Sequence, residues 1–150
     1  MDSVLLSLPG AVPAETLDAG VAAHYGDPVA EQRALERGVA FVDRGDRGVL
    51  TVTGPDRLTW LHSLTSQHLE ALAPGLATEA LVLDPNGRVE HHMSLVDVDG
   101  TVWAHVEPGT APALAAYLDS MRFMMRVEVA DRTADTAVLT LAGPASEQAV

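Results

Sequence analysis

One short pattern occurs twice in the amino-acid sequence. Val49–Pro55 (VLTVTGP) and Val138–Pro144 (VLTLAGP) each join an alternating apolar run to Gly-Pro, and they begin 89 residues apart (138 − 49 = 89). Alternation predicts a strand, and the proline suits the first turn of a helix, where a missing N–H is tolerated. Only Ala145–Val150 follows the second copy. A unit that begins again and then stops predicts a larger, pseudo-symmetric protein, of which this chain is the N-terminal part.

Composition excludes several classes of function. The chain has 150 residues, a hydrophobic content of 47% and a formal net charge of −12. Direct binding to nucleic acid is disfavoured, because phosphate contacts need clustered Arg or Lys. The sequence has no cysteine, which excludes disulfides, thiolate metal sites and iron–sulfur clusters ligated by these residues. The apolar run Val4–Leu6 is too short for a membrane span or a signal peptide, so we expect a cytoplasmic protein.

The N-terminal half is predicted to begin irregularly and then to mix helices and strands. Residues 1–26 carry several Pro and Gly and are expected to form a lead-in with one short strand at Val4–Leu8. Asp27-Pro28 resembles an N-cap followed by proline at the first helical position, and Gly38 suits the residue after a helix. The elements expected are a helix over 28–37, strands over 39–42 and 49–53, and a helix from Pro55.

The C-terminal half is predicted to form a meander and one amphipathic helix. Asp84–Gly87 is a turn between strands 78–83 and 88–96, and Asp99-Gly100 leads into a third strand, 101–106. After Thr110, apolar residues at i, i+3, i+4 and i+7 predict a helix that ends at Met124 or Met125, followed by a strand at 127–129. The expected fold class is α+β, an antiparallel sheet with helices packed against it. We expect three segments, which are an irregular N-terminal lead-in over 1–26, an α+β unit over 27–133, and the start of a truncated second repeat over 134–150.

The histidines and methionines are the first candidates for chemistry. Strand alternation puts the adjacent His91 and His92 on opposite faces, so they do not share a metal, whereas Glu90 and His92 point the same way. Two ligands are fewer than a metal site needs, and we expect no metal. Asp97, Asp99 and Gly100 resemble the start of a calcium loop, but a hairpin turn explains them. Met121, Met124 and Met125 are interpreted as core packing rather than as a ligand slot.

Several segments together resemble a known family. They are His24–Pro28, Val42–Arg44, Val52–Arg57, Trp60–Ser66 and Asp84–Arg88. Over residues 24–150 the chain is similar to the N-terminal domain of the YgfZ-type folate-binding proteins, which belong to the superfamily of the glycine-cleavage aminomethyltransferase, or T-protein. The resemblance implies a pseudo-repeated fold around a central channel that binds tetrahydrofolate or a derivative. It also implies a role in assembly or repair of iron–sulfur clusters in client enzymes, linked in some bacteria to tRNA modification.

Departures from the family pattern define the candidate site. In T-proteins an Asp-Asp pair follows the hairpin turn, and by the resemblance Glu90-His91 takes that place here. A folate-contacting tyrosine four residues after a glycine corresponds to Glu79, four residues after Gly75. The resemblance therefore implies Glu79, Glu90 and His91 as cofactor-binding residues and leaves open whether the protein is an enzyme.

Two alternatives to the role in iron–sulfur assembly remain. One is a folate-dependent aminomethyltransferase or demethylase, in which Glu90 is the acidic residue facing the folate. The other is a non-catalytic interaction domain. The Lys-Gly-Cys signature of the YgfZ group is absent from the sequence, and we expect it beyond Val150. Expected partners are a reduced folate, iron–sulfur client proteins and, through an unpaired strand edge at Val138–Leu141, other copies of the chain.

Overall fold

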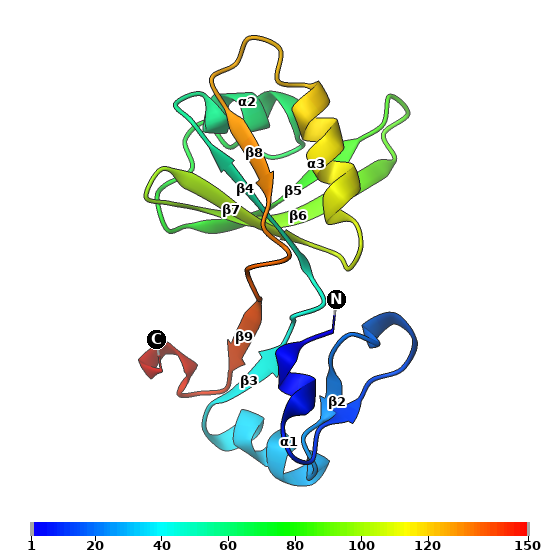
Figure 1. Cartoon of the computed structure of the whole chain (residues 1–150). Coiled ribbons are helices and arrows are strands. Elements are labelled where there is room, and N and C mark those ends of the chain that lie inside the picture. Colours follow the sequence, from blue (N-terminus) through cyan, green and yellow to red (C-terminus); the bar gives the residue numbers. More distant parts are fainter. Residues whose placement is uncertain (1, 150) are drawn as a thin grey trace. The chain divides into compact units, whose positions relative to one another are not determined.

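The chain folds into two compact units (Figure 1). The computed structural model describes residues 2–149. Unit 1 combines the N-terminal part of the chain, up to Asp46, with the C-terminal part from Ala137, and unit 2 is the continuous stretch Arg47–Thr136. The sequence-based division at residues 26 and 133 concerns repeats in a longer protein and stays a prediction. Within the described residues, no helix has the length and apolar character needed to cross a membrane.

Unit 2 is built on a five-stranded antiparallel sheet in the order β5-β6-β7-β4-β8. Its strands are β4 (Gly48–Thr53), β5 (Ala77–Leu83), β6 (Val89–Val98), β7 (Thr101–Val106) and β8 (Glu128–Asp131). The predicted α+β class and the β5-β6-β7 meander are confirmed. The turn before β6 forms because the Asp84 carboxylate accepts the N–H groups of Asn86 and Arg88, while Gly87 supplies a φ of +80°.

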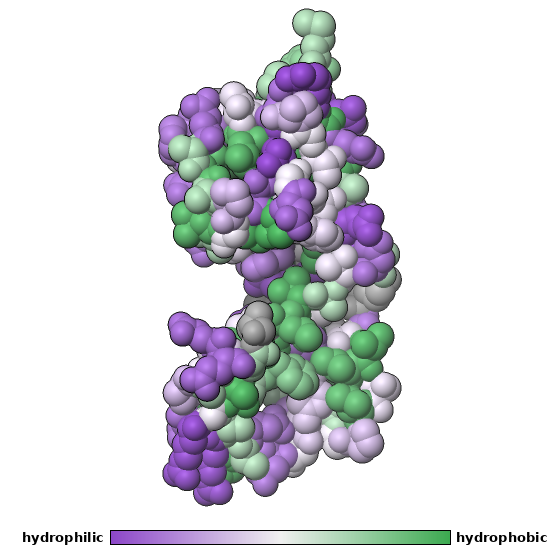
Figure 2. Space-filling model, turned by 90° about the vertical axis from the view of Figure 1, so that its left-hand side faces the viewer, coloured by the Kyte–Doolittle hydropathy of each residue, from purple (hydrophilic) through white to green (hydrophobic). Residues whose placement is uncertain are grey.

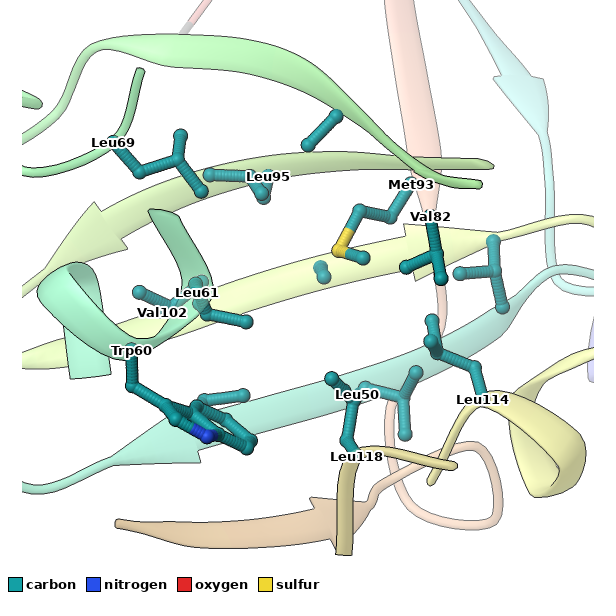
Figure 3. Close-up of a cluster of buried hydrophobic side chains, with 14 of the residues drawn as sticks. Leu50, Trp60, Leu61, Leu69, Val82, Met93, Leu95, Val102, Leu114 and Leu118 are labelled. Atoms are coloured by element: carbon teal, nitrogen blue, oxygen red, sulfur yellow. The ribbon is translucent and has the colours of Figure 1, made fainter. Parts of the chain in front are cut away.

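Two helices cover one face of this sheet and close the core. They are α2 (Arg57–Leu64) and α3 (Ala111–Ser120). Figure 3 shows Trp60 and Leu61 of α2 pointing toward the strands, where they meet Leu50 and Val102. The Trp60 indole donates its N–H to the carbonyl of Met121 at 3.0 Å, so even this buried polar atom is satisfied. Trp60 and Leu61 of α2, with Leu114 and Leu118 of α3, thus cover the face of the sheet on which the two helices pack.

The end of α3 and the methionines after it differ from expectation. The helix ends at Ser120, because the Met121 N–H closes the last turn and Phe123 adopts a φ of +45°, which no helix continues. Met121 packs partly against the core, but Met124 is 97% exposed. Met125 is also exposed, at 36%. The interpretation of Met124 and Met125 as core packing is therefore wrong, because the helix stops before its spacing can carry these side chains inward.

Unit 1 contains one helix, two small sheets and short turns. Its elements are η1 (Val4–Ser7), β1 (Val12–Pro13), η2 (Thr16–Asp18), β2 (Ala22–His24), α1 (Pro28–Arg37), β3 (Ala40–Asp43), β9 (Leu139–Ala142) and η3 (Ser146–Gln148). The predicted helix 28–37 is confirmed, with the Asp27 carboxylate accepting the Ala30 N–H. The strand predicted at Val4–Leu8 is wrong. A 3-10 turn forms instead, because the Ser3 hydroxyl accepts the Leu5 N–H and caps it.

Both repeated strands take part in equivalent antiparallel pairs, β4 with β8 and β9 with β3. The pairs are Leu50 with Asp131 and Thr53 with Glu128, and Leu139 with Asp43 and Ala142 with Ala40. Residues of β9 follow their β4 counterparts by 89 positions, and β8 follows β3 by 88 (131 − 43 = 88). The backbone hydrogen bond just beyond each strand pair also matches. Arg132 N–H donates to Val49 C=O at 2.8 Å, and Arg44 N–H donates to Val138 C=O at 2.9 Å.

The glycine of each Gly-Pro is required by a close backbone approach. Gly54 has a φ of +107°, and a Cβ there would overlap the carbonyl oxygen of Arg126 and lie 2.9 Å from its carbonyl carbon. Gly143 has a φ of +115°, and its Cβ would overlap the carbonyl of Gly38 in the same way. The contacted residues again differ by 88 positions (126 − 38 = 88). In each copy of the repeat, the glycine therefore lets the end of its strand lie closer to another backbone segment than a side chain would permit.

Candidate functional site

The face of the five-stranded sheet opposite α2 and α3 carries polar and aromatic side chains. Because alternate residues of a strand point to opposite faces, the buried Leu50, Met93 and Ala104 fix which residues point away from the helices. In the register of β5, β6 and β7, these outward residues form adjacent cross-strand rows. We define the open face by Glu79 on β5, His92 and Ser94 on β6, and Trp103 and His105 on β7.

Glu79 and His92 form a cross-strand pair on the open face. The imidazole Nε2 of His92 lies 3.6 Å from the Glu79 carboxylate, and the two side chains are 33% and 73% exposed. The pair is an ion pair only while the imidazole is protonated. Both groups remain accessible to a ligand.

Arg47 organises the neighbouring part of the face. Its Nε donates to Nδ1 of His105 at 3.0 Å, and its Nη2 donates to Glu107 at 2.6 Å. Because Nδ1 of His105 accepts a hydrogen bond, the proton of the neutral ring lies on Nε2. A guanidinium held by two partners fixes the orientation of this imidazole.

Trp103 gives the open face an aromatic surface. Its side chain lies opposite Val96 of β6 and Thr51 of β4 and is 37% exposed, whereas the chain's other tryptophan, Trp60, is buried. The sequence analysis missed Trp103, His105 and Arg47. The alternation of β7 could have found the first two, since Val102, Ala104 and Val106 are the apolar, inward set.

The predicted site residues do not all come together. Glu90 is exposed at a β-bulge, where Leu83 pairs with Val89 and Val82 pairs with His91, leaving Glu90 as the extra residue. His91 lies on the helix-covered side, with its ring centre 6.1 Å from that of Tyr117 in α3. The structure therefore brings Glu79 of β5 close to His92 of β6. Glu90 lies on β6 with His92, at the bulge, whereas His91 points to the opposite, helix-covered side of the sheet.

Metal ligands do not converge anywhere in the described part of the chain. No group of three or more His, Asp or Glu side chains within residues 2–149 could hold a metal ion. His62 and His68 have ring centres 4.7 Å apart in an edge-to-face arrangement. This is an aromatic contact rather than a set of converging ligands.

Unit 1 contains a hollow of about 870 Å³ with a mainly apolar lining. The Tyr25 hydroxyl donates to the Asp43 carboxylate at 3.3 Å, and the Tyr25 N–H donates to Glu31 at 2.8 Å. Burial, followed by the nearby negative charge of Asp43, raises the pKa of Tyr25 above its ordinary value. The residue thus stays protonated and bridges β2, α1 and β3.

Comparisons with known proteins agree on one family. A family model described as the GCVT N-terminal domain matches residues 10–150. A chloroplastic protein of Arabidopsis thaliana, named as a transferase, is 29% identical over 116 residues, covering 77% of this chain and 27% of that protein. An aminomethyltransferase of Cutibacterium acnes is 29% identical over 135 residues, covering 84% of this chain and 34% of that protein. This chain therefore spans about a third or less of these relatives.

A solved structure shares the fold. The glycine cleavage system aminomethyltransferase T from Bartonella henselae superposes with a TM-score of 0.78, at 17% sequence identity, over 93% of this chain and 38% of that one. At this identity the match shows the shared fold. The mixed α+β architecture is thus that of a glycine-cleavage T-protein.

Proposed function

The chain belongs to the GCVT N-terminal domain family, and on this premise we propose that it is the N-terminal portion of a folate-binding protein. Its aminomethyltransferase-like fold supports a reduced folate as the cofactor. The finer proposal is a YgfZ-type protein that serves iron–sulfur enzymes without holding a cluster itself. The absence of cysteine from the sequence accords with that last point.

The pairing of Glu79 with His92 on the open face is the observation that carries the proposal. Glu79 stands where the family resemblance implies a folate contact, and its carboxylate is 73% exposed. A reduced pterin presents an amino group and ring N–H groups along one edge, which a carboxylate can accept as charge-assisted hydrogen bonds. The flat face of the pterin fits against the exposed indole of Trp103.

The proposed folate contacts keep two of the three residues that the family resemblance implies. Glu79, with Glu90 along the same hairpin, supplies the carboxylates, and His92 orients Glu79. His91 faces Tyr117, so we assign it no direct contact with the folate. A ligand held by one surface alone is only partly enclosed, and we expect the remaining walls to come from the rest of a longer protein.

Calorimetric titration with tetrahydrofolate tests the binding site. We expect Glu79→Gln and Glu90→Ala each to weaken binding about tenfold, a loss of about 1.4 kcal/mol. Glu70→Gln is the matched control, because Glu70 is an exposed glutamate in the segment between α2 and β5 and is not one of the residues that define the open face. Binding that is unchanged in both site variants would remove these carboxylates from the site.

A folate-dependent aminomethyltransferase or demethylase is the second candidate. It is favoured by the names of the bacterial relatives, which are aminomethyltransferases. Two assays of the longer protein separate the candidates. One measures methylenetetrahydrofolate formed from tetrahydrofolate and an aminomethylated carrier protein, and the other measures recovery of a damaged iron–sulfur enzyme with folate present. Turnover in the first assay without recovery in the second would replace the YgfZ-type proposal.

A further inference from the structure

Three polar residues of the open face lie in one row across three strands. Glu79 of β5 lies directly opposite Ser94 of β6, and Ser94 lies directly opposite His105 of β7. Residues that face each other across antiparallel strands share one side of the sheet, and neighbouring strands lie about 4.8 Å apart. The row therefore extends about 10 Å from Glu79 to His105.

The hydrogen-bonding character changes along this row. An ionised carboxylate only accepts hydrogen bonds, and that of Glu79 is 73% exposed. At the other end, the Arg47 Nε–H donates to Nδ1 of His105 at 3.0 Å. Since a guanidinium never accepts, Nδ1 is the acceptor and the proton of the neutral ring lies on Nε2. The row thus has an acceptor at one end and an N–H donor at the other.

Arg47 is held firmly enough to keep the ring in this form. Its side chain is only 15% exposed, and its Nη2 donates to Glu107 at 2.6 Å. A protonated His105 ring would lose the bond from Arg47, because both ring nitrogens would then be donors. Arg47 therefore selects one tautomer of His105, and with it decides whether Nε2 donates to a ligand or accepts from it.

The order of these groups distinguishes the row from other polar surface. On the side of unit 2 that forms the upper half of Figure 2, polar and apolar side chains are mixed, so polarity alone does not mark a site. In the row, by contrast, an acceptor and a donor stand a fixed distance apart on one face of the sheet. The exposed indole of Trp103 lies beside them, two residues from His105 along β7. This arrangement suits a flat ring that carries N–H groups and a carbonyl oxygen.

We propose that His105 donates its Nε2–H to the oxygen at C4 of the pterin, and that Arg47 is a positioning residue that acts through His105. This inference rests on the proposed function, in which Glu79 accepts from the amino group at C2 and the N–H at N3. The oxygen at C4 comes next along the ring edge, so a donor is required there. A separation of about 10 Å leaves room for the ring edge and a hydrogen bond of about 2.9 Å at each side.

The consequence is selection for folates that carry an oxygen at C4. An analogue with an amino group at C4 would direct a donor at the donor of His105, and neither group would be satisfied. A site built around such a hydrogen bond rejects a ring that cannot make it. Without Arg47, the His105 ring could carry its proton on Nδ1 and accept from the amino group through Nε2. The selection would then weaken although His105 itself is still present.

Calorimetric titration with tetrahydrofolate and with its 4-amino analogue, both under reducing conditions, tests the selection. We expect the unchanged chain to bind tetrahydrofolate at least about tenfold more tightly than the analogue. Arg47→Gln and His105→Gln should each reduce that ratio at least about threefold, and the double variant should reduce it no further, because Arg47 acts through His105. Arg122→Gln is the matched control, because it also removes an ion-paired arginine, whose partner is Asp119, and Arg122 is not on the open face.

Nuclear magnetic resonance reads the tautomer directly. Long-range ¹H–¹⁵N spectra should show the proton of His105 on Nε2, and Arg47→Gln should give a mixture of both tautomers. A ratio near one in the unchanged chain, or a ratio that Arg47→Gln leaves unaltered, would overturn the proposal. If Arg47→Gln does not fold, the ratio measured with His105→Gln decides. Weaker tetrahydrofolate binding in Glu79→Gln with an unaltered ratio in His105→Gln would remove this inference alone, whereas unweakened binding in Glu79→Gln would contradict the proposed function itself.

Discussion

Replacing Gly54 by alanine should destabilise unit 2 far more than alanine at a glycine with open surroundings. A non-glycine residue with positive φ costs about 1–2 kcal/mol by itself. At Gly54 the added Cβ also overlaps the Arg126 carbonyl, so the end of β4 must move away from the segment that precedes β8. That movement strains the bonds from Arg126 to Asp56, where the backbone N–H donates at 2.9 Å. Displacing a well-packed segment costs up to about 3 kcal/mol and occasionally more, so together with the positive φ we expect a total loss of about 3–5 kcal/mol.

Gly75→Ala isolates the backbone part of this effect. Gly75 has a φ of +77°, and a Cβ there meets nothing within 4 Å. Both tryptophans, Trp60 and Trp103, lie in unit 2, so urea unfolding followed by tryptophan fluorescence reports on this unit. We expect Gly54→Ala to lose at least about 2 kcal/mol more than Gly75→Ala, or roughly 10 °C or more in Tm for a unit of 90 residues (136 − 47 + 1 = 90). Equal losses would show that the contact with Arg126 relaxes easily and would refute the reasoning.

Three further predictions concern ion pairs and metals. Asp97 is 3% exposed and binds Arg57 through both oxygens at 2.8 Å, so Asp97→Ala should cost about 3–5 kcal/mol in urea unfolding, and a loss below about 1 kcal/mol would contradict this. Hydrogen bonds from Arg126 lower the pKa of Asp56, so its stabilisation is present above about pH 4 and is lost as the pH falls through the folded pKa. The stability difference from Asp56→Asn should therefore shrink in acid, and a constant difference would exclude this linkage. Elemental analysis should find far less than one iron or zinc per chain, and a value near one would contradict the absence of converging ligands.

Local signals predicted much of the fold. Asp84–Gly87 and Asp99-Gly100 specify tight turns through side-chain capping and positive φ, so the meander follows from sequence alone. The Asp27-Pro28 cap and Gly38 likewise predicted both ends of α1. These features depend on residues a few positions apart, where spacing carries the information.

Non-local pairing explains what the sequence did not predict. The position of β4 between β7 and β8 depends on contacts between segments about 50 to 80 residues apart, which local periodicity does not encode. The open face has the same origin, since Trp103 and His105 join Glu79 and His92 only through the β5-β6-β7 register. Strand alternation predicted that Glu90 points the same way as His92, but a bulge at Glu90 interrupts that alternation.

The most direct test of folate binding at the open face is chemical-shift mapping. The ¹⁵N-labelled chain would be titrated with tetrahydrofolate under reducing conditions, and amide and indole N–H signals would be followed. We expect saturable shifts at Glu79, His92 and the Trp103 indole, with little change at the buried Trp60 indole, which is bonded to Met121. Glu79→Gln should weaken these shifts in parallel. Saturable shifts confined to unit 1, or no shifts at millimolar folate, would contradict a folate site on the open face.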